Sequence, residues 1–408
     1  MNELDISQKI LNKAAEIEPK IIKIRHQIHQ NPELSFQEKE TAALAAAEMH
    51  KLGFKVRKNI FGTGVTATFK NSNAENSKTL LIRADMDALP VLEKNDLEYI
   101  SKNEGVMHAC GHDGHTAILI GTAVVLKELA QEFEGNLKFL FQPGEETSGG
   151  AAGMIKEGVL ENPQVDAALG LHLWGSTAEG VVEYKSGPFM ASPDHFDLKI
   201  IGKGGHAARP HNTIDPIPIG AEIISTLQKI VSRRVDPLES AVISVCNFDS
   251  GSTHNVIPDT AVLKATVRSL KPEIRKQLAA NIEKVIKNIC DIYDADYEFD
   301  YVFGYPPVIN NSEMTKLLSE SAAKVLGKDR VREREKAEMG GEDFSFFGEQ
   351  VPSVFYFLGI APEGEIINHH QADFKFNDSV LKDGVAVMAQ TALDFFAKKM
   401  GNKEWYNE

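Results

Sequence analysis

The chain has 408 residues, which exceeds the usual single-domain range and predicts two domains. Hydrophobic residues make up 42% and charged residues 25%, the balance of a globular protein, and the formal net charge is −14. The acidic residues are spread along the chain, so the charge argues against a nucleic-acid partner and against an anionic membrane surface, both of which attract basic patches.

The patterns that direct a chain to a membrane or out of the cell are missing from the sequence. The N-terminal stretch MNELDISQKILNKAAE lacks the apolar core of a signal peptide, and the longest apolar run, residues 117–126, is about half of a bilayer span. The three cysteines, Cys110, Cys246 and Cys290, form no disulfide framework and fit a reducing compartment. We therefore expect a cytoplasmic protein.

The first part of the chain alternates between helical and strand patterns. Apolar residues at helical spacing predict helices over about residues 6–30, 37–52 and 116–130. Short β-rich runs predict strands over residues 55–60, 65–69, 79–84, 136–141 and 165–171. This alternation predicts an α/β fold whose mixed sheet is partly parallel.

The pattern changes near Gly187-Pro188. Strand, helix, strand, strand, helix and strand patterns follow over residues 196–201, 214–231, 241–248, 261–270, 272–292 and 297–303. This βαββαβ order predicts a ferredoxin-like module. The chain then returns to helix and strand and ends in a helix over about residues 379–399. We therefore predict a catalytic α/β domain of residues 1–187 and 304–408, interrupted by a small domain of residues 188–303.

The strongest chemical signal is the segment His108-Ala-Cys110-Gly-His112-Asp113-Gly-His115. Its spacing fits neither a helix face nor a strand face, so we expect a loop in which a thiolate and an imidazole turn toward one ion. Both groups are good ligands for zinc-like metals. The alternative is an exposed histidine-rich loop with a buried free cysteine, and it is weaker because further candidate ligands follow.

Carboxylates and a histidine stand after other predicted strands. Glu145-Glu146 follow residues 136–141, and adjacent carboxylates repel, so one needs a cation while the other can serve as a base with a raised pKa. Asp85 and Asp87 follow residues 79–84, and His172 is expected at the end of the strand 165–171. Each alone would more often be structural, but the carboxyl ends of strands are where open α/β sheets bind ligands. We expect one shared site.

The set of candidate ligands indicates which metals the site would take. Thiolate, imidazole and carboxylate together suit zinc, manganese, cobalt or nickel better than magnesium or calcium. The ligands outnumber those of one tetrahedral ion, so we expect two divalent ions with a bridging water and a carboxylate that carries the proton. A further pair, His369-His370, lies far along the chain and is uninformative by itself.

Together these motifs resemble the aminoacylase and carboxypeptidase family of di-metal amidohydrolases, which are metallopeptidase-like enzymes. The nearest branch is that of hippurate hydrolase, the N-acyl-L-amino-acid amidohydrolases and the indoleacetyl-amino-acid hydrolases. The matching segments cover nearly the whole chain: HQNPELSFQE, RADMDALPV, HACGHDGH, FQPGEE, GLHLWG, GGHAARPH, NVIPD, ATVRSL, GGEDFSFF and HHQADFKFND. The resemblance implies a catalytic domain interrupted by a βαββαβ lid and dimerisation domain.

The resemblance also implies a set of metal ligands. They are Cys110, bridging both ions, His112 and Glu146 on one ion, and His172 and His370 on the other. His370 is chosen over His369 because the family's ligand stands four residues before an aromatic residue, here Phe374. Glu145 would be the general base, and Asp87 would orient ligands without binding metal. Asp85 stands where more distant relatives carry a metal-binding histidine.

Further site residues are implied in the small domain and just beyond it. His206, in Gly-Gly-His, resembles the histidine that stabilises the tetrahedral oxyanion, from its own chain or a partner's. Asn255 and Arg268 resemble groups that hold the substrate, Arg268 by a charged fork onto its carboxylate. The backbone at Gly341 would contribute as well. The alternatives are a turn-forming asparagine and a strand-edge arginine.

The resemblance implies a hydrolase that converts an N-acetyl, benzoyl or similar N-acyl-L-amino acid to a carboxylic acid and a free amino acid. A metallo-carboxypeptidase or dipeptidase for short peptides uses the same chemistry and stays open. A non-catalytic relative should have lost the base or a ligand, yet all are present, and no dinucleotide or P-loop pattern follows a strand. A homodimer is implied by the resemblance alone, and the motifs encode neither the acyl group nor the metal.

Overall fold

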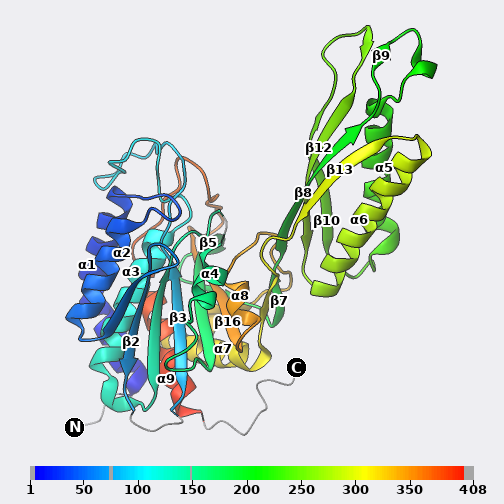
Figure 1. Ribbon diagram of the computed structural model, residues 1–408. Helices are drawn as coiled ribbons and strands as arrows, with labels where there is room; N and C mark the ends of the chain where they lie inside the picture. The colour runs from blue at the N-terminus through cyan, green and yellow to red at the C-terminus, as the bar shows by residue number, and fades with distance from the viewer. Residues whose placement is uncertain (1–4, 73–76, 148, 399–408) are drawn as a thin grey trace. The chain divides into compact units, whose positions relative to one another are not determined.

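The computed structural model describes residues 5–72, 77–147 and 149–398, which divide into two compact units (Figure 1). Unit 1 takes its described residues from Met1–Gly187, Ile309–Lys336 and Asp343–Glu408. Unit 2 consists of Pro188–Val308 and Ala337–Glu342. The small domain expected at residues 188–303 lies inside unit 2, which also includes residues 304–308 and 337–342.

Unit 1 is built on an eight-stranded sheet with the order β1-β2-β4-β3-β5-β16-β6-β15. The strands are β1 (Lys55–Ile60), β2 (Gly64–Lys70), β3 (Thr79–Asp85), β4 (Asn136–Gln142), β5 (Ala167–Ala178), β6 (Val182–Tyr184), β15 (Val331–Glu333) and β16 (Ser353–Ala361). The central neighbours β4, β3, β5 and β16 run parallel, while β1, β2 and β6 pair antiparallel with their inner neighbours. The predicted mixed, partly parallel sheet is confirmed.

Helices pack against this sheet and against one another. They are α1 (Ile6–Gln30), α2 (Lys39–Lys51), α3 (His112–Glu128), α4 (Gly150–Lys156), α7 (Ser312–Leu326), α8 (Ser345–Gly348) and α9 (Val380–Ala397), with short 3₁₀ turns η1 (Ala130–Glu132) and η3 (Lys328–Arg330). Helices α1, α3 and α9 contact one another, and α7 packs on α9. The apolar period of α1 buries five isoleucines, each stabilising the fold by roughly 1.5–3 kcal/mol. Residue 399, expected in the last helix, lies outside the described residues.

Two sequence-based expectations near the site are wrong. Residues 112–115 were expected in a loop, but α3 begins at His112, because Gly111 ends the loop with φ at +97° and Asp113 favours a first turn. His172 was expected at a strand end, but it lies inside β5, opposite Phe357 of β16. The parallel pairing with β16 extends β5 beyond the apolar run that the sequence displays.

Unit 2 contains a four-stranded antiparallel sheet with the order β10-β12-β8-β13. Its elements in chain order are β8 (Ser192–Ile201), α5 (Pro216–Arg234), β10 (Ala241–Asp249), β12 (Thr260–Ser269), α6 (Pro272–Ile292) and β13 (Asp296–Val302). A separate ribbon pairs β9 (Gly205–His206) with β11 (Val256–Ile257), and η2 spans Pro210–Asn212. Strands β7 (Gly187–Met190) and β14 (Val308–Asn310) each include a point where the chain passes from one unit to the other. The βαββαβ order read from the sequence is present.

The core of unit 2 lies between its sheet and the helices α5 and α6. Alternate residues of β8, Phe196, Leu198 and Ile200, are fully buried in it, as the period of two predicts. Across both units, none of the helices that the structure describes is long and apolar enough to cross a membrane.

Candidate metal centre

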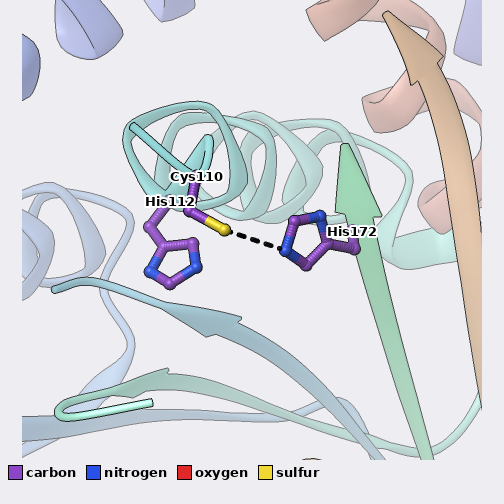
Figure 2. Close-up of side chains that lie close together, drawn as sticks. All are labelled: Cys110, His112 and His172. Atoms are coloured by element: carbon purple, nitrogen blue, oxygen red, sulfur yellow. Dashed lines mark hydrogen bonds between the residues drawn. The ribbon is translucent and has the colours of Figure 1, made fainter. Parts of the chain in front are cut away.

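Three ligand-type side chains of unit 1 converge beside the start of α3. Cys110 precedes the helix, His112 is its first residue, and His172 extends from β5. Figure 2 shows the sulfur of Cys110 directed at the ring of His172, 3.5 Å from its Nε2, with the ring of His112 on the other side of the sulfur. All three side chains are buried, and their ligand atoms lie within 4.8 Å of one another.

Backbone carbonyls orient both imidazole rings. His112 Nδ1 lies 2.9 Å from the carbonyl oxygen of Asp87, and His172 Nδ1 lies 2.7 Å from that of Leu173. A carbonyl only accepts hydrogen bonds, so each Nδ1 carries a hydrogen, and in the neutral form of each ring the Nε2 lone pair is directed into the cluster. Metal-binding histidines are oriented in this way. The buried Nε2 of His112 has no hydrogen-bond partner among the described residues.

A carboxylate and a third imidazole adjoin the cluster. Glu146 Oε1 lies 3.8 Å from His112 Nε2, and Glu146 Oε2 lies 3.3 Å from His370 Nε2. The ligand atoms of Cys110, Glu146 and His370 also lie within 4.8 Å of one another. His370 has a φ of +62°, and its backbone N–H donates to the carbonyl of Ala109 at 2.8 Å. Non-glycine residues held in this region gather at functional sites.

The Asp87 carboxylate orients the two neighbouring glutamates. Its Oδ1 accepts from the backbone N–H of Glu145 at 3.1 Å, and its Oδ2 accepts from that of Glu146 at 3.0 Å and from Ser35 Oγ at 2.7 Å. Burial opposes the charged form of Asp87, but the hydrogen bond and charge of His112, together with the hydrogen bonds from Ser35 and Glu146, outweigh it and lower the pKa of this carboxyl. Asp87 is therefore a charged carboxylate that binds the backbone of the turn after β4 and orients the glutamates in that turn.

The electrostatics of the cluster favour a cation. Burial opposes a charge on His112, but Asp85, Asp87 and Glu146 outweigh it and raise the pKa of His112 to about 10. Burial, and next the charge of Glu146, raises the pKa of the Cys110 thiol well above its ordinary value. A bound divalent ion would replace the proton on the imidazole and convert the thiol to a thiolate. The donor set therefore fits a soft or borderline divalent metal.

Two nearby histidines have their ring nitrogens engaged in other bonds. His115 Nδ1 lies 2.6 Å from Asp85 Oδ1, and its Nε2 accepts from the backbone N–H of Leu173 at 2.9 Å. His369 Nε2 lies 3.0 Å from the carbonyl of Leu173. Asp85 also pairs with Arg83 at 2.6 Å, although its ligand atoms lie close to those of the histidines of α3. Sequence spacing alone could not separate these groups from the candidate ligands.

Glu145 lies at the same cluster. It is 8% exposed, and one of its carboxylate oxygens lies within 4.8 Å of ligand atoms of His112 and Glu146. The turn that presents it is close-packed, because a Cβ on Gly144, whose φ is +66°, would come within 2.4 Å of the Phe36 ring. A buried carboxylate next to a metal-type cluster has the position that a proton carrier needs.

Two of the candidates in unit 2 lie together. β9 pairs with β11 so that His206 stands opposite Val256, and the backbone N–H of Ala207 donates to the carbonyl of Asn255 at 3.2 Å. Both His206 and Asn255 are exposed. The His206 Nδ1 accepts from the backbone N–H of Ala208 at 3.0 Å, which leaves Nε2 as the outer nitrogen of the ring.

The other two candidates lie elsewhere in unit 2. Arg268, half-buried, is near the end of β12 opposite Pro193, whereas the ribbon of His206 adjoins the start of β12 at Thr260. Arg268 stands eight positions after Thr260 along β12, a span of about 27 Å. Gly341 packs against Pro193, whose Cγ would lie 2.6 Å from an added Cβ. Unit 2 therefore does not bring Arg268 and His206 together.

The model of peptidase family M20/M25/M40 matches residues 81–394. The chain belongs to this family. The resemblance inferred from the motifs is thereby confirmed, and family membership makes the chain a hydrolase that acts on amide bonds.

Individual relatives are similar over most of the chain. N-acyl-L-amino acid amidohydrolase of Geobacillus stearothermophilus is 44% identical over 299 residues, covering 73% of this chain and 80% of the relative. Thermostable carboxypeptidase 2 of Saccharolobus solfataricus is 39% identical over 400 residues, covering 97% of this chain and 100% of the relative. The crystal structure of the YXEP protein of Bacillus subtilis, a dinuclear metal binding peptidase from the M20 family, has a TM-score of 0.81 and 34% identity, covering 94% of this chain and 99% of that one.

Proposed function

We propose that the protein is a metal-dependent amidohydrolase that cleaves N-acyl-L-amino acids to a carboxylic acid and a free amino acid. The observation that carries the proposal is the buried meeting of Cys110, His112 and His172 beside the two carboxylates Glu145 and Glu146. The similarity to an N-acyl-L-amino acid amidohydrolase supports the substrate class.

The cluster would hold two divalent ions chosen from zinc, manganese, cobalt and nickel. Cys110 would be shared between them. The ligand atoms form two groups around Cys110, one with His112 and His172 and one with Glu146 and His370, so we propose that each group holds one ion, in place of the pairing that the resemblance implies. The dinuclear site of the similar YXEP protein supports the number of ions. The ions, when bound, supply Lewis acidity that lowers the pKa of a water molecule and offsets negative charge on the substrate oxygen.

Glu145 would act as the general base. Its carboxylate takes a proton from the attacking water and passes it to the nitrogen of the leaving amine, which must be protonated before the amide bond breaks. Asp87 acts as a positioning residue, since it binds the backbone N–H groups of Glu145 and Glu146 with one carboxylate. Burial of the cluster strengthens each of these electrostatic interactions.

We propose that the active form is a homodimer whose sites combine residues of both chains. An N-acyl amino acid is far shorter than the span of about 27 Å along β12 that separates the ribbon of His206 from Arg268. Arg268 of one chain would therefore bind the substrate carboxylate, and His206 and Asn255 would come from the other chain. His206 would donate to the oxyanion, and the backbone at Gly341 would line the substrate.

A substrate panel tests the proposal. Protein stripped of metal and reloaded with zinc, manganese, cobalt or nickel is assayed on N-acetyl-, N-benzoyl- and indoleacetyl-amino acids, on their methyl esters and on dipeptides. We expect kcat/KM for an N-acyl amino acid to exceed that for dipeptides at least tenfold. We also expect a lower kcat/KM for the methyl esters, because esterification removes the carboxylate charge that Arg268 would bind. Loaded protein that hydrolyses none of these amides would contradict the proposal.

The second candidate function is that of a carboxypeptidase or dipeptidase, which the similarity to thermostable carboxypeptidase 2 favours. The same panel separates the two, because faster cleavage of dipeptides would select this candidate. Under either function we propose a cytoplasmic location, supported by cysteines Cys110, Cys246 and Cys290 that are all free thiols.

A further inference from the structure

Two cationic side chains of α1 are buried one helical turn apart. Arg25 is 0% exposed and His29 is 1% exposed. Burying a guanidinium costs free energy unless charged partners surround it. The partners of Arg25 and His29 therefore show which parts of the fold these two residues hold together. Those partners belong to two segments that are distant in the sequence.

The first partner is the residue that follows a candidate ligand. Arg25 Nε lies 3.1 Å from Asp113 Oδ2, and His29 Nδ1 lies 2.9 Å from the same oxygen. Asp113 is fully buried in the first turn of α3, directly after His112. Burial opposes the charged form of Asp113, but Arg25 and His29 outweigh it and hold its pKa below the usual range. Both cations of α1 thus restrain the metal loop, which we define as residues 108–113.

The second partner segment is residues 374–378, which begins four residues after His370. Arg25 Nη1 donates to the carbonyl of Phe376 at 3.3 Å and contacts the Asp378 carboxylate, and its guanidinium lies 3.5 Å over the Phe376 ring. In the chain, Phe376 lies 351 positions after Arg25, and Asp378 lies 353 positions after it. Arg25 therefore contacts residues 374–378, the segment that follows His370, directly.

His29 reaches the same segment through two intermediates, Glu93 and Asn95. Its Nε2 lies 3.2 Å from Glu93 Oε1, and Asn95 Nδ2 donates to that oxygen at 3.1 Å and to the carbonyl of Phe374 at 3.0 Å. Burial opposes a charge on His29, but the hydrogen bonds with Asp113 and Glu93 outweigh it and raise its pKa to about 9. At neutral pH the ring carries both hydrogens and donates to both carboxylates.

We propose that Arg25 and His29 are positioning residues of the metal centre. Both residues belong to α1. They hold the metal loop, which contains Cys110 and His112, and the segment next to His370 in fixed positions relative to each other. This inference rests on the proposed ligand set and adds that α1, which supplies no ligand itself, determines how strongly the set binds metal. A residue that orients ligands in this way commonly changes metal affinity by about 10- to 100-fold.

The competing explanation is a buried ion network that stabilises the fold and nothing else. Unit 2 offers a matched control, because Arg275 forms a buried pair with Asp194 at 2.6 Å and also donates to the carbonyl of Gly304 at 2.7 Å. Its side chain is 13% exposed and that of Asp194 is 0% exposed. No proposed metal ligand is among these contacts, so Arg275→Gln reports the cost of losing a buried arginine alone.

The test titrates metal-free wild type, Arg25→Gln, His29→Gln and Arg275→Gln with Co²⁺ and follows binding by absorption, with thermal unfolding of the same samples. We expect Co²⁺ binding about tenfold weaker or more in Arg25→Gln and His29→Gln, and unchanged in Arg275→Gln, although all three melt earlier. Arg25→Lys should recover part of the affinity. Asp113→Asn should weaken binding similarly, and combining it with Arg25→Gln should cost less than the sum of the two separate losses, because the contact between Arg25 and Asp113 is lost in both variants.

Wild-type Co²⁺ affinity in folded His29→Gln and Asp113→Asn would overturn the inference, even where Arg25→Gln is too unstable to measure. Equal losses in all variants, Arg275→Gln included, would also overturn it in favour of a general stability effect. Wild-type protein that binds no Co²⁺ would overturn the proposed function itself. The two failures are thus distinguished by the wild-type titration.

Discussion

The metal cluster of unit 1 and the β9/β11 ribbon of unit 2 both supply proposed catalytic groups, but they are built in opposite ways. In the cluster, Cys110, His112 and His172 are buried, and carbonyls fix both rings. At the ribbon, which lies outside the four-stranded sheet, His206 of β9 and Asn255, in the turn just before β11, are exposed.

The difference follows from what each region must bind. Ligands for a metal ion must be oriented before the ion arrives, because the cost of ordering them would otherwise reduce affinity. A group that meets only the substrate can stay exposed until substrate is bound and a closed site excludes water. Changes to the metal ligands of the cluster should therefore act through metal content, and changes in the ribbon should act through turnover alone.

The largest effect is expected from Cys110→Ala. The thiolate is shared by both proposed ions, so its loss should lower occupancy at both positions and abolish turnover. Elemental analysis should find two ions per chain in the wild type, with binding weaker in acid as thiolate and imidazoles are protonated. Cys290→Ala, a buried cysteine of α6, is the control and should keep its metal. One ion per chain in fully active wild type would contradict the two-ion proposal.

Glu145→Gln should separate chemistry from metal binding within the cluster. Glutamine keeps the size of the side chain and cannot carry the proton, so turnover should fall about 10²- to 10⁴-fold while two ions remain bound. Elemental analysis and single-turnover kinetics on the same sample measure both quantities. Near-normal turnover in fully loaded Glu145→Gln would exclude Glu145 from the mechanism.

His206→Ala tests the ribbon. Losing one donor to the oxyanion typically costs about 10²- to 10³-fold in turnover, and metal content should not change. His195→Ala, at an exposed position of β8 in the same unit, is the control. If turnover in His206→Ala matched the wild type, the proposed role would be lost.

Mixing variants tests whether the ribbon acts across the dimer. Homodimers of His206→Ala and of Glu145→Gln each lack one group in both sites. A mixed dimer should contain one intact composite site and recover part of the activity. An isotopically verified mixed dimer without recovery would place His206 in the site of its own chain.

The sequence predicted most elements because their apolar periods and end signals are local. The bounds of α1, residues 6–30, and of α6, residues 272–292, agree with the structure. Its failures have tertiary causes: β5 continues past His172 because β16 pairs with it, and α3 begins at His112 because Gly111 turns the chain. Neither cause is visible in the residues beside the failure.

The site was predicted by residue type and spacing, which identify groups that can bind metal but not where their lone pairs point. His115 and His369 belong to the same motifs as the proposed ligands, yet the backbone of Leu173 engages a ring nitrogen of each. The roles of Arg25 and His29 were missed for a similar reason, since their partners lie as far as 353 residues away. The HQNPELSFQE segment, which begins with His29, carries part of the resemblance but implies no role for either residue.

The smallest expected effect concerns the buried support of the cluster. His29 is surrounded by the carboxylates of Asp113 and Glu93, by the guanidinium of Arg25, and by the rings of Tyr99 and His108. The carboxylates raise its pKa to about 9, whereas the unfolded chain has the ordinary value near 6.5.

A raised pKa stabilises the fold at low pH and loses that effect at high pH. Below pH 6.5 both states hold the proton and the contribution of His29 is complete, on the order of 3 kcal/mol. As pH rises toward 9 the unfolded chain releases its proton first, so the contribution declines and is lost above the folded pKa. The unfolding free energy of metal-free wild type should therefore exceed that of His29→Gln most at pH 6, and the difference should shrink by pH 10. Urea titrations of both proteins and of the exposed α2 control His50→Gln measure it, and a wild-type advantage over His29→Gln that stays constant from pH 6 to pH 10 would show that His29 holds no extra proton in the fold.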